Sequence, residues 1–150
     1  MAISTQITNV LNGTIESVKS VIPLPVTIEK PKLIQQPLTQ TSIGVLIGMT
    51  GDIRGRLVIE GSQDSIGRIG QSMFGMPLEG EILESFAGEL GNMIAGNLAT
   101  SVAQKGVEMD ITPPTVLVGQ TKLYGFDKAL CLPVSFTEIG NIRIILMVEQ

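Results

Sequence analysis

A chain of 150 residues is long enough for one domain with a single hydrophobic core, and a composition of 43% hydrophobic and 16% charged residues excludes disorder. The net charge of -4 gives no basic surface for nucleic acid, and the ten lysines and arginines do not gather beside an apolar membrane anchor. Histidine is absent and Cys131 is the only cysteine, which excludes Ser-His-Asp and Cys-His catalysis, most catalytic zinc sites and an internal disulfide.

The first residues lack the basic and apolar regions of a signal peptide. No apolar run approaches the roughly 18 residues that indicate a membrane span. We therefore expect a cytoplasmic protein without a membrane partner.

The first half of the chain shows a helical period, then proline-broken extended sequence, then two β-rich runs joined by turn residues. Pro23 and Pro25 would end the first helix, and Ser62 is a suitable N-cap for another. These signals predict, in order, a helix over 5–21, an extended segment over 26–40, a β-hairpin from 42–49 and 55–60, and a short helix over 62–74.

The second half begins with a long helical pattern that Gly106 would end. After Pro113 and Pro114 the sequence becomes strand-like, with a turn signal at 138–141 for the last hairpin. We expect a single α+β domain, residues 1–150, with the helices packed on one face of an antiparallel sheet. The elements of this half are a helix over 81–105 and a meander of strands over 115–118, 121–126, 129–136 and 141–149.

The long helix divides into three surfaces on a wheel of about 100° per residue. An apolar arc should face the sheet, a flank of small residues should let another segment approach closely, and a third stripe is polar. The arc consists of Ile82, Phe86, Leu90, Met93 and Ile94, the flank of Gly88, Gly91, Ala95 and Ala99, and the stripe of Ser85, Glu89, Asn92 and Gly96.

Glu89 and Asn92 lie one turn apart and can therefore address the same object. Asparagine is unfavourable inside a helix because its side chain competes for backbone hydrogen bonds, so Asn92 points to a role other than helix stability. A polar stripe on a helix is usually an ordinary solvated face, and the wheel alone favours that interpretation. Asn97 falls within the apolar arc, where we expect a buried and hydrogen-bonded amide.

The motif Ser85-x-x-x-Glu89-x-x-Asn92, continued by Met93-Ile94-Ala95-Gly96-Asn97, resembles the signature of the CheC/CheX phosphatases. The later segment Ile111-Thr112-Pro113-Pro114-Thr115-Val116 resembles the proline segment that follows the motif in that family. Length and element order agree with the single-motif CheX branch, so the resemblance covers nearly the whole chain. It implies a CheC/CheX-like domain that removes the phosphoryl group from the phosphoaspartate of a CheY-like response regulator in chemotaxis or another two-component pathway.

The resemblance also implies roles for single residues. Asn92 would position the attacking water, and Glu89 would pair with the active-site lysine of the regulator. Ser85 would hydrogen-bond at the rim of the interface. Gly88 and Gly96 would let the partner's backbone come close, although close packing within the chain explains these glycines equally well.

A helix over 5–21 would carry Glu16-Ser17-Val18-Lys19, with Lys19 where a second motif would need asparagine, so we expect one working site. By resemblance the chain has no cofactor or metal of its own, Mg²⁺ is supplied by the phosphorylated regulator, and two copies form a homodimer by joining sheet edges. The apolar run 142–148 would be an aggregation hazard if it lay at such an edge.

Two other functions fit the same residues. The long helix could bind a response regulator or a flagellar-switch protein without accelerating hydrolysis, as a non-catalytic binding module. The polar stripe could also be the wet surface of a structural or assembly protein. Release of phosphate in the presence and absence of the chain separates the enzyme from both.

Overall fold

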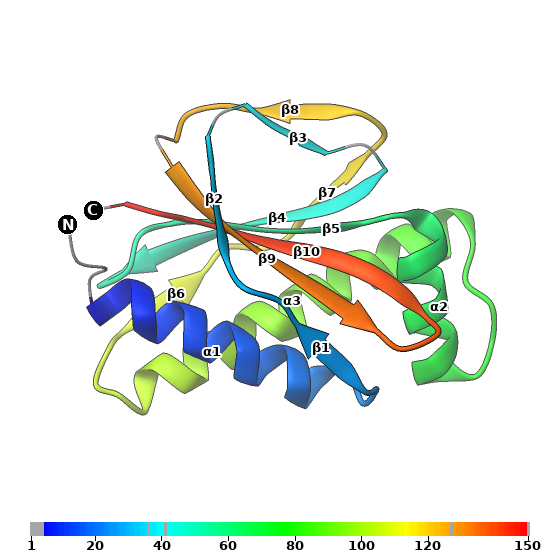
Figure 1. The fold of residues 1–150 in the computed structure, drawn as a ribbon, viewed down its shortest axis with the longest axis horizontal. Helices are drawn as coiled ribbons and strands as arrows, with labels where there is room; N and C mark the ends of the chain where they lie inside the picture. The colour runs from blue at the N-terminus through cyan, green and yellow to red at the C-terminus, as the bar shows by residue number, and fades with distance from the viewer. Residues whose placement is uncertain (1–4, 36, 41, 127, 150) are drawn as a thin grey trace.

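The computed structural model describes residues 5–35, 37–40, 42–126 and 128–149, which form layers around one large sheet (Figure 1). The expectation that the first residues form no signal peptide concerns in part residues 1–4, and these lie outside the described residues. No helix in the described ranges is long and apolar enough to cross a membrane. The helices are α1 (Thr5–Val21), α2 (Gln63–Phe74) and α3 (Gly80–Ala103). The strands are β1 (Val26–Ile28), β2 (Lys32–Gln35), β3 (Leu38–Gln40), β4 (Ile43–Gly51), β5 (Gly55–Gly61), β6 (Met109–Ile111), β7 (Thr115–Val118), β8 (Thr121–Leu123), β9 (Lys128–Phe136) and β10 (Gly140–Val148).

The large sheet is antiparallel and has β10 near its centre. Its order is β1-β9-β10-β5-β4-β6, while β2 also pairs with β9 and β7 also pairs with β4. The expected α+β class and the β4–β5 hairpin are confirmed. The expected C-terminal meander is wrong except for the β9–β10 hairpin, because β7 pairs with β4 and β8 pairs with β3. The run 142–148 lies between β9 and β5, so it is not a sheet edge.

Side chains alternate along each strand, and both faces of the large sheet are buried over part of their area. On β10, Ile144 and Leu146 join the large core between the sheet and the helices, whereas Ile145 and Met147 join a smaller core on the opposite face of the sheet. A two-stranded sheet of β3 and β8 covers that smaller core, with Leu38 as its buried contribution. Figure 1 shows this second layer above the large sheet and the helices below it. This second layer was not expected from the sequence.

Helix α1 packs along α3 in the helical layer. A Cβ added to Gly13 would lie 2.8 Å from Cδ1 of Leu98, which shows how closely the two helices approach. Ser17 is 2% exposed, and its hydroxyl donates a 2.6 Å hydrogen bond to the backbone carbonyl of Ile94. Ser17, which belongs to the segment where a second motif would lie, is therefore buried between α1 and α3.

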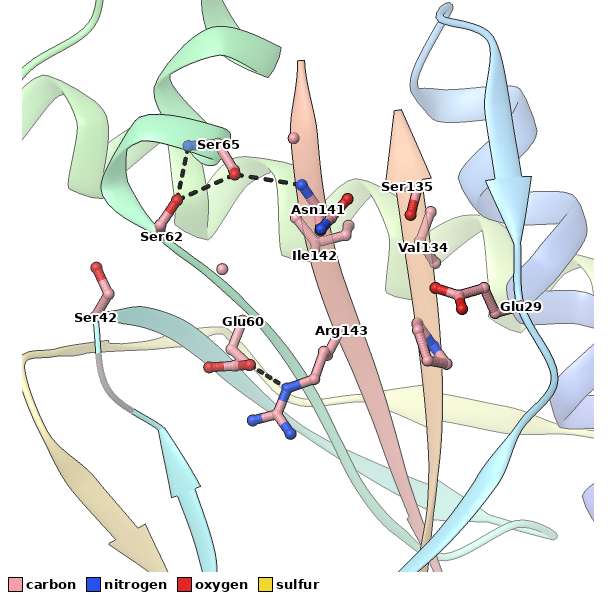
Figure 2. Close-up of a pocket in the computed structure, with 13 residues that line it drawn as sticks. Glu29, Ser42, Glu60, Ser62, Ser65, Val134, Ser135, Asn141, Ile142 and Arg143 are labelled. Carbon is pink, nitrogen blue, oxygen red and sulfur yellow. Dashed lines mark hydrogen bonds and ion pairs between the residues drawn. The ribbon is translucent and has the colours of Figure 1, made fainter. Parts of the chain in front are cut away.

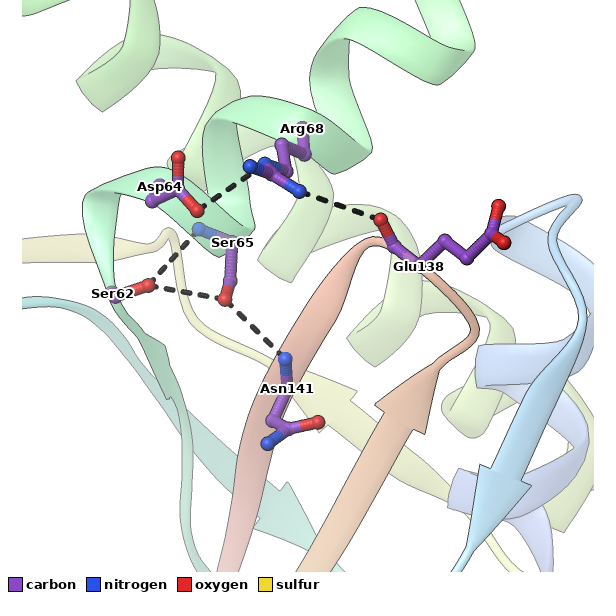
Figure 3. Close-up of polar contacts among 6 residues, drawn as sticks. All are labelled: Ser62, Asp64, Ser65, Arg68, Glu138 and Asn141. Atoms are coloured by element: carbon purple, nitrogen blue, oxygen red, sulfur yellow. Dashed lines mark hydrogen bonds and ion pairs between the residues drawn. The ribbon is translucent and has the colours of Figure 1, made fainter.

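Helix α2 has the boundaries that its capping residues predict. Ser62 accepts a hydrogen bond of 3.0 Å from the backbone N–H of Ser65. The Ser65 hydroxyl in turn accepts one of 3.3 Å from the backbone N–H of Asn141, and Arg68 donates to the backbone carbonyl of Glu138 (Figure 3). The start of α2 is thus joined to the β9–β10 hairpin.

Candidate active site on helix α3

The polar stripe of α3 faces away from the core, as expected. Ser85, Glu89 and Asn92 are exposed, and Gly96 is half-buried. Within the described part of the chain, the side chains of Glu89 and Asn92 form neither a hydrogen bond nor an ion pair. A carboxylate and an amide one turn apart are therefore both available to another molecule.

The opposite side of α3 explains why the helix is held in this orientation. Its large buried residues include Leu90, Ile94 and Leu98, all of which are inaccessible or nearly so. A Cβ added to Gly91 would lie 2.8 Å from Cγ1 of Val45 on β4, so the helix backbone lies directly on the sheet. The small-residue flank thus allows close approach of another segment, as the sequence predicts.

The two glycines assigned to partner binding differ in their surroundings. A Cβ added to Gly88 would lie 3.2 Å from Cγ2 of Val116 on β7, and Gly88 is buried. This contact favours packing within the chain as the reason for Gly88. A Cβ added to Gly96 would meet nothing within 4 Å, so the surface beside Gly96 is open.

The expected apolar arc is wrong at two positions. Ile82 is 62% exposed and Met93 is 39% exposed, although both were expected to face the sheet. Because β4 packs against Gly91 while α1 packs beside Ile94 and Leu98, the buried surface of α3 is centred nearer Gly91. One margin of the expected arc is therefore left in solvent.

Asn97 is also exposed, so the expected buried amide is wrong. Phe86 and Leu90 point within about 20° of Asn97 on the wheel and are buried, so Asn97 is exposed because of its position further along α3; its Nδ2 donates a hydrogen bond of 3.1 Å to the backbone carbonyl of Met93. Asn97 is thus an exposed amide on the motif helix that lies off the polar stripe.

A separate polar groove of about 490 Å³ lies on the sheet face opposite the helices, beside the β3–β8 layer (Figure 2). Glu60 is buried there and pairs with Arg143, which also donates to the backbone carbonyl of Thr39. Burial opposes the charge of Arg143, but the hydrogen bond and charge of Glu60 outweigh it and raise the pKa of Arg143. This groove contains none of the residues that the sequence predicts as a site.

No group of three or more His, Cys, Asp or Glu side chains that could hold a metal ion occurs in the residues that the structure describes. Cys131, beneath the β3–β8 layer, is buried, and burial raises the pKa of its thiol.

Comparison with known proteins identifies the family. The family model for the chemotaxis phosphatase CheX matches residues 43–131, which include the whole of α3. This chain belongs to the CheX family. A CheY-P phosphatase CheX from Thermotoga maritima is 35% identical over 136 residues, which is 87% of this chain and 87% of that relative.

Solved structures show the same fold. A CheC-like superfamily protein from Shewanella sp. PV-4 has a TM-score of 0.81 at 25% identity, covering 99% of this CheX-family chain and 100% of the other. A CheX from Borrelia burgdorferi, solved in a complex with CheY, BeF₃ and Mg²⁺, has a TM-score of 0.78 at 21% identity and covers 96% and 97% of the two chains. The expected CheC/CheX-like fold is thereby confirmed.

Proposed function

We propose that this chain is a phosphatase that accelerates hydrolysis of the phosphoaspartate of a CheY-type response regulator. The observation that carries the proposal is the exposed and unpaired pair of Glu89 and Asn92 on the motif helix of a CheX-family chain. The Thermotoga maritima relative is a CheY-P phosphatase, which supports the reaction. The Borrelia burgdorferi complex with CheY supports the class of partner.

In the proposed reaction, water attacks phosphorus in line with its bond to the aspartate oxygen. That P–O bond breaks, the aspartate carboxylate is regenerated, and the phosphoryl group leaves as inorganic phosphate with the oxygen and protons of the water. Little covalent chemistry is required of the phosphatase, so positioning and electrostatics account for the acceleration. The amide carbonyl of Asn92 accepts a hydrogen bond from the water and fixes its direction of attack.

Glu89 has a different role in this proposal. A carboxylate directed at a phosphoryl group would repel it, so Glu89 pairs instead with the active-site lysine of the regulator. The pair fixes the register in which α3 meets the regulator, with Ser85 hydrogen-bonding at the rim. Mg²⁺ is assigned to the phosphorylated regulator, and this chain supplies no cofactor. The compartment that we propose is the cytoplasm.

The test is the release of phosphate from phosphorylated CheY of Thermotoga maritima, with and without this chain. Asn92→Ala should abolish the acceleration and leave the fold and most of the binding intact, because only the water-orienting group is lost. Asn97→Ala is the matched control, since it removes an exposed amide from the same helix away from the polar stripe, and should retain the wild-type rate.

Three outcomes separate the hypotheses. A wild-type rate for Asn92→Ala would show that the proposed mechanism is wrong. Binding of the phosphorylated regulator by the wild-type chain without any acceleration would establish the non-catalytic binding module instead. Glu89→Ala should weaken binding more than it slows the bound reaction, and an unchanged affinity would exclude Glu89 as the lysine partner.

We also propose a homodimer joined through strands at the margins of the large sheet. Those margins carry β1 and β2 beside β9, and β6 and β7 beside β4. Unpaired backbone groups on an edge strand can be satisfied by a second copy. Sedimentation that gives a monomer at micromolar concentration would refute the dimer.

A further inference from the structure

Exposed apolar side chains gather next to the candidate active site. The large hydrophobic residues exposed in the described ranges are seven, and four of them fall between residues 74 and 93. Two of these four, Ile82 at 62% and Met93 at 39% exposure, lie on α3 itself. Their exposure is the feature that helical periodicity did not predict.

Ile82 and Met93 lie on the same surface of α3 as Glu89. At about 100° per residue, Ile82 points about 20° and Met93 about 40° from the direction of Glu89. Met93 lies one turn after Glu89, and Ile82 two turns before it. The anionic group is thus bracketed along the helix by two apolar side chains.

A third side chain extends this surface toward α2. Phe74, at the end of α2, is 61% exposed and lies edge-on to Phe86, with 5.7 Å between the ring centroids and 90° between the planes. Phe86 follows Ile82 by one helical turn. We call Phe74, Ile82 and Met93 the apolar rim.

We propose that the apolar rim binds an apolar surface of the response regulator beside its phosphoaspartate pocket and provides much of the affinity of the complex. This inference rests on the proposed function. For Asn92 to reach a phosphoryl group inside another protein, that protein must cover α3 around Asn92. A partner that also pairs with Glu89 covers that surface too, where Met93 lies one turn of about 5.4 Å beyond Glu89 and Ile82 lies two turns before it.

The division of roles follows from the chemistry of the surface. Removing apolar side chains from water is favourable wherever the partner is also apolar, and this term is large but not directional. The charge of Glu89 chiefly sets orientation, because a cation in the partner must come to one point, and removal of Glu89 weakens binding because it leaves that cation unpaired. The rim therefore supplies binding strength and Glu89 supplies register.

The experiment measures affinity for CheY of Thermotoga maritima loaded with BeF₃ and Mg²⁺, by titration calorimetry. Ile82→Ser and Met93→Ser should each weaken binding about tenfold, which is about 1.4 kcal/mol. In phosphate-release assays the loss should fall on KM more than on kcat. Ile82→Leu and Met93→Leu keep the apolar area and should restore near-wild-type affinity.

Leu33→Ser is the matched control, because Leu33 is an apolar side chain that is 67% exposed away from the rim. It lies on β2, which pairs with β9 at one margin of the sheet, whereas β6 and β7 lie at the other margin. Its affinity should equal that of the wild type. Thermal unfolding of all variants confirms that each is folded, as substitution of exposed side chains should allow. If Ile82→Ser and Met93→Ser bind as tightly as Leu33→Ser, the rim is not the docking surface.

Two further results distinguish the possible failures. If the rim variants become monomeric in sedimentation but keep their affinity for CheY, the rim contacts a second copy of this chain and the proposal is overturned. If the wild-type chain neither binds CheY nor accelerates its dephosphorylation, the proposed function itself fails and the inference falls with it. If the wild-type chain is active and the rim variants keep its affinity for CheY, the inference is refuted while the proposed function stands.

Discussion

Alanine substitutions of two glycines on α3 should shift stability in opposite directions. At Gly91, an added Cβ would lie 2.8 Å from Cγ1 and 3.1 Å from Cβ of Val45, a β-branched residue on a strand paired on both sides. Val45 cannot move without displacing β4, so overpacking should cost roughly 1–3 kcal/mol. At Gly96, an added Cβ would meet nothing within 4 Å.

Both substitutions also gain roughly 0.8–1 kcal/mol of helix propensity, because glycine is that much less favourable than alanine inside a helix. Gly96→Ala should therefore stabilise the fold by up to about 1 kcal/mol, and Gly91→Ala should destabilise it by about 1 kcal/mol. In a domain of this size, 1 kcal/mol corresponds to a change in Tm of about 2–4 °C. Urea unfolding of the two variants measures the difference directly.

The same pair of variants tests the role of Gly96 in partner binding. If the regulator's backbone approaches Gly96 closely, Gly96→Ala should be more stable than the wild type and yet bind phosphorylated CheY less tightly. If Gly91→Ala proves as stable as Gly96→Ala, the close packing of α3 on β4 does not have the energetic effect inferred from these distances.

Three further predictions concern buried polar groups. Ser17→Ala removes the 2.6 Å hydrogen bond to the Ile94 carbonyl and should lower the free energy of unfolding by about 1 kcal/mol, as calorimetry can measure. Arg143→Met leaves the carboxylate of Glu60 without its cation and should lower the free energy of unfolding by about 2–3 kcal/mol. This loss is smaller than for a fully buried ion pair because the Arg143 side chain is 38% exposed. An unchanged midpoint of urea unfolding would contradict this prediction. Burial raises the pKa of Cys131 above its ordinary 9.0, so the folded state holds the proton more tightly than the unfolded state. This stabilisation is complete below the ordinary pKa and is lost at higher pH, so the wild type should lose more stability than Cys131→Ala as the pH rises above the ordinary pKa of 9.0.

Local signals predicted most of the elements. The period of α1, the Ser62 cap of α2, and the turn between β4 and β5 are all encoded by residues close together in the sequence. The β3–β8 layer was not predicted because its strands are three residues each and pair across a long sequence separation. Strands of that length carry no periodicity, and their pairing is decided by tertiary contacts.

The polar stripe was predictable because its residues are separated by whole helical turns. The rotation of α3 was not predictable, since it depends on α1 and β4 covering the Gly91 side at once. Ile82 and Met93 were misplaced for this reason, and with them the apolar rim. The sequence suggested which residues would share a face, while the neighbours of that face decided where it ends.

The position of β10 has a consequence for biosynthesis. Its partners β5 and β9 precede it in the chain, and β10 fills the gap between them. Until residues 140–148 leave the exit tunnel of the ribosome, β5 has no partner on its β10 side, and the large core lacks Ile144 and Leu146. Nascent chains of this domain should therefore need protection by chaperones until β10 emerges from the exit tunnel.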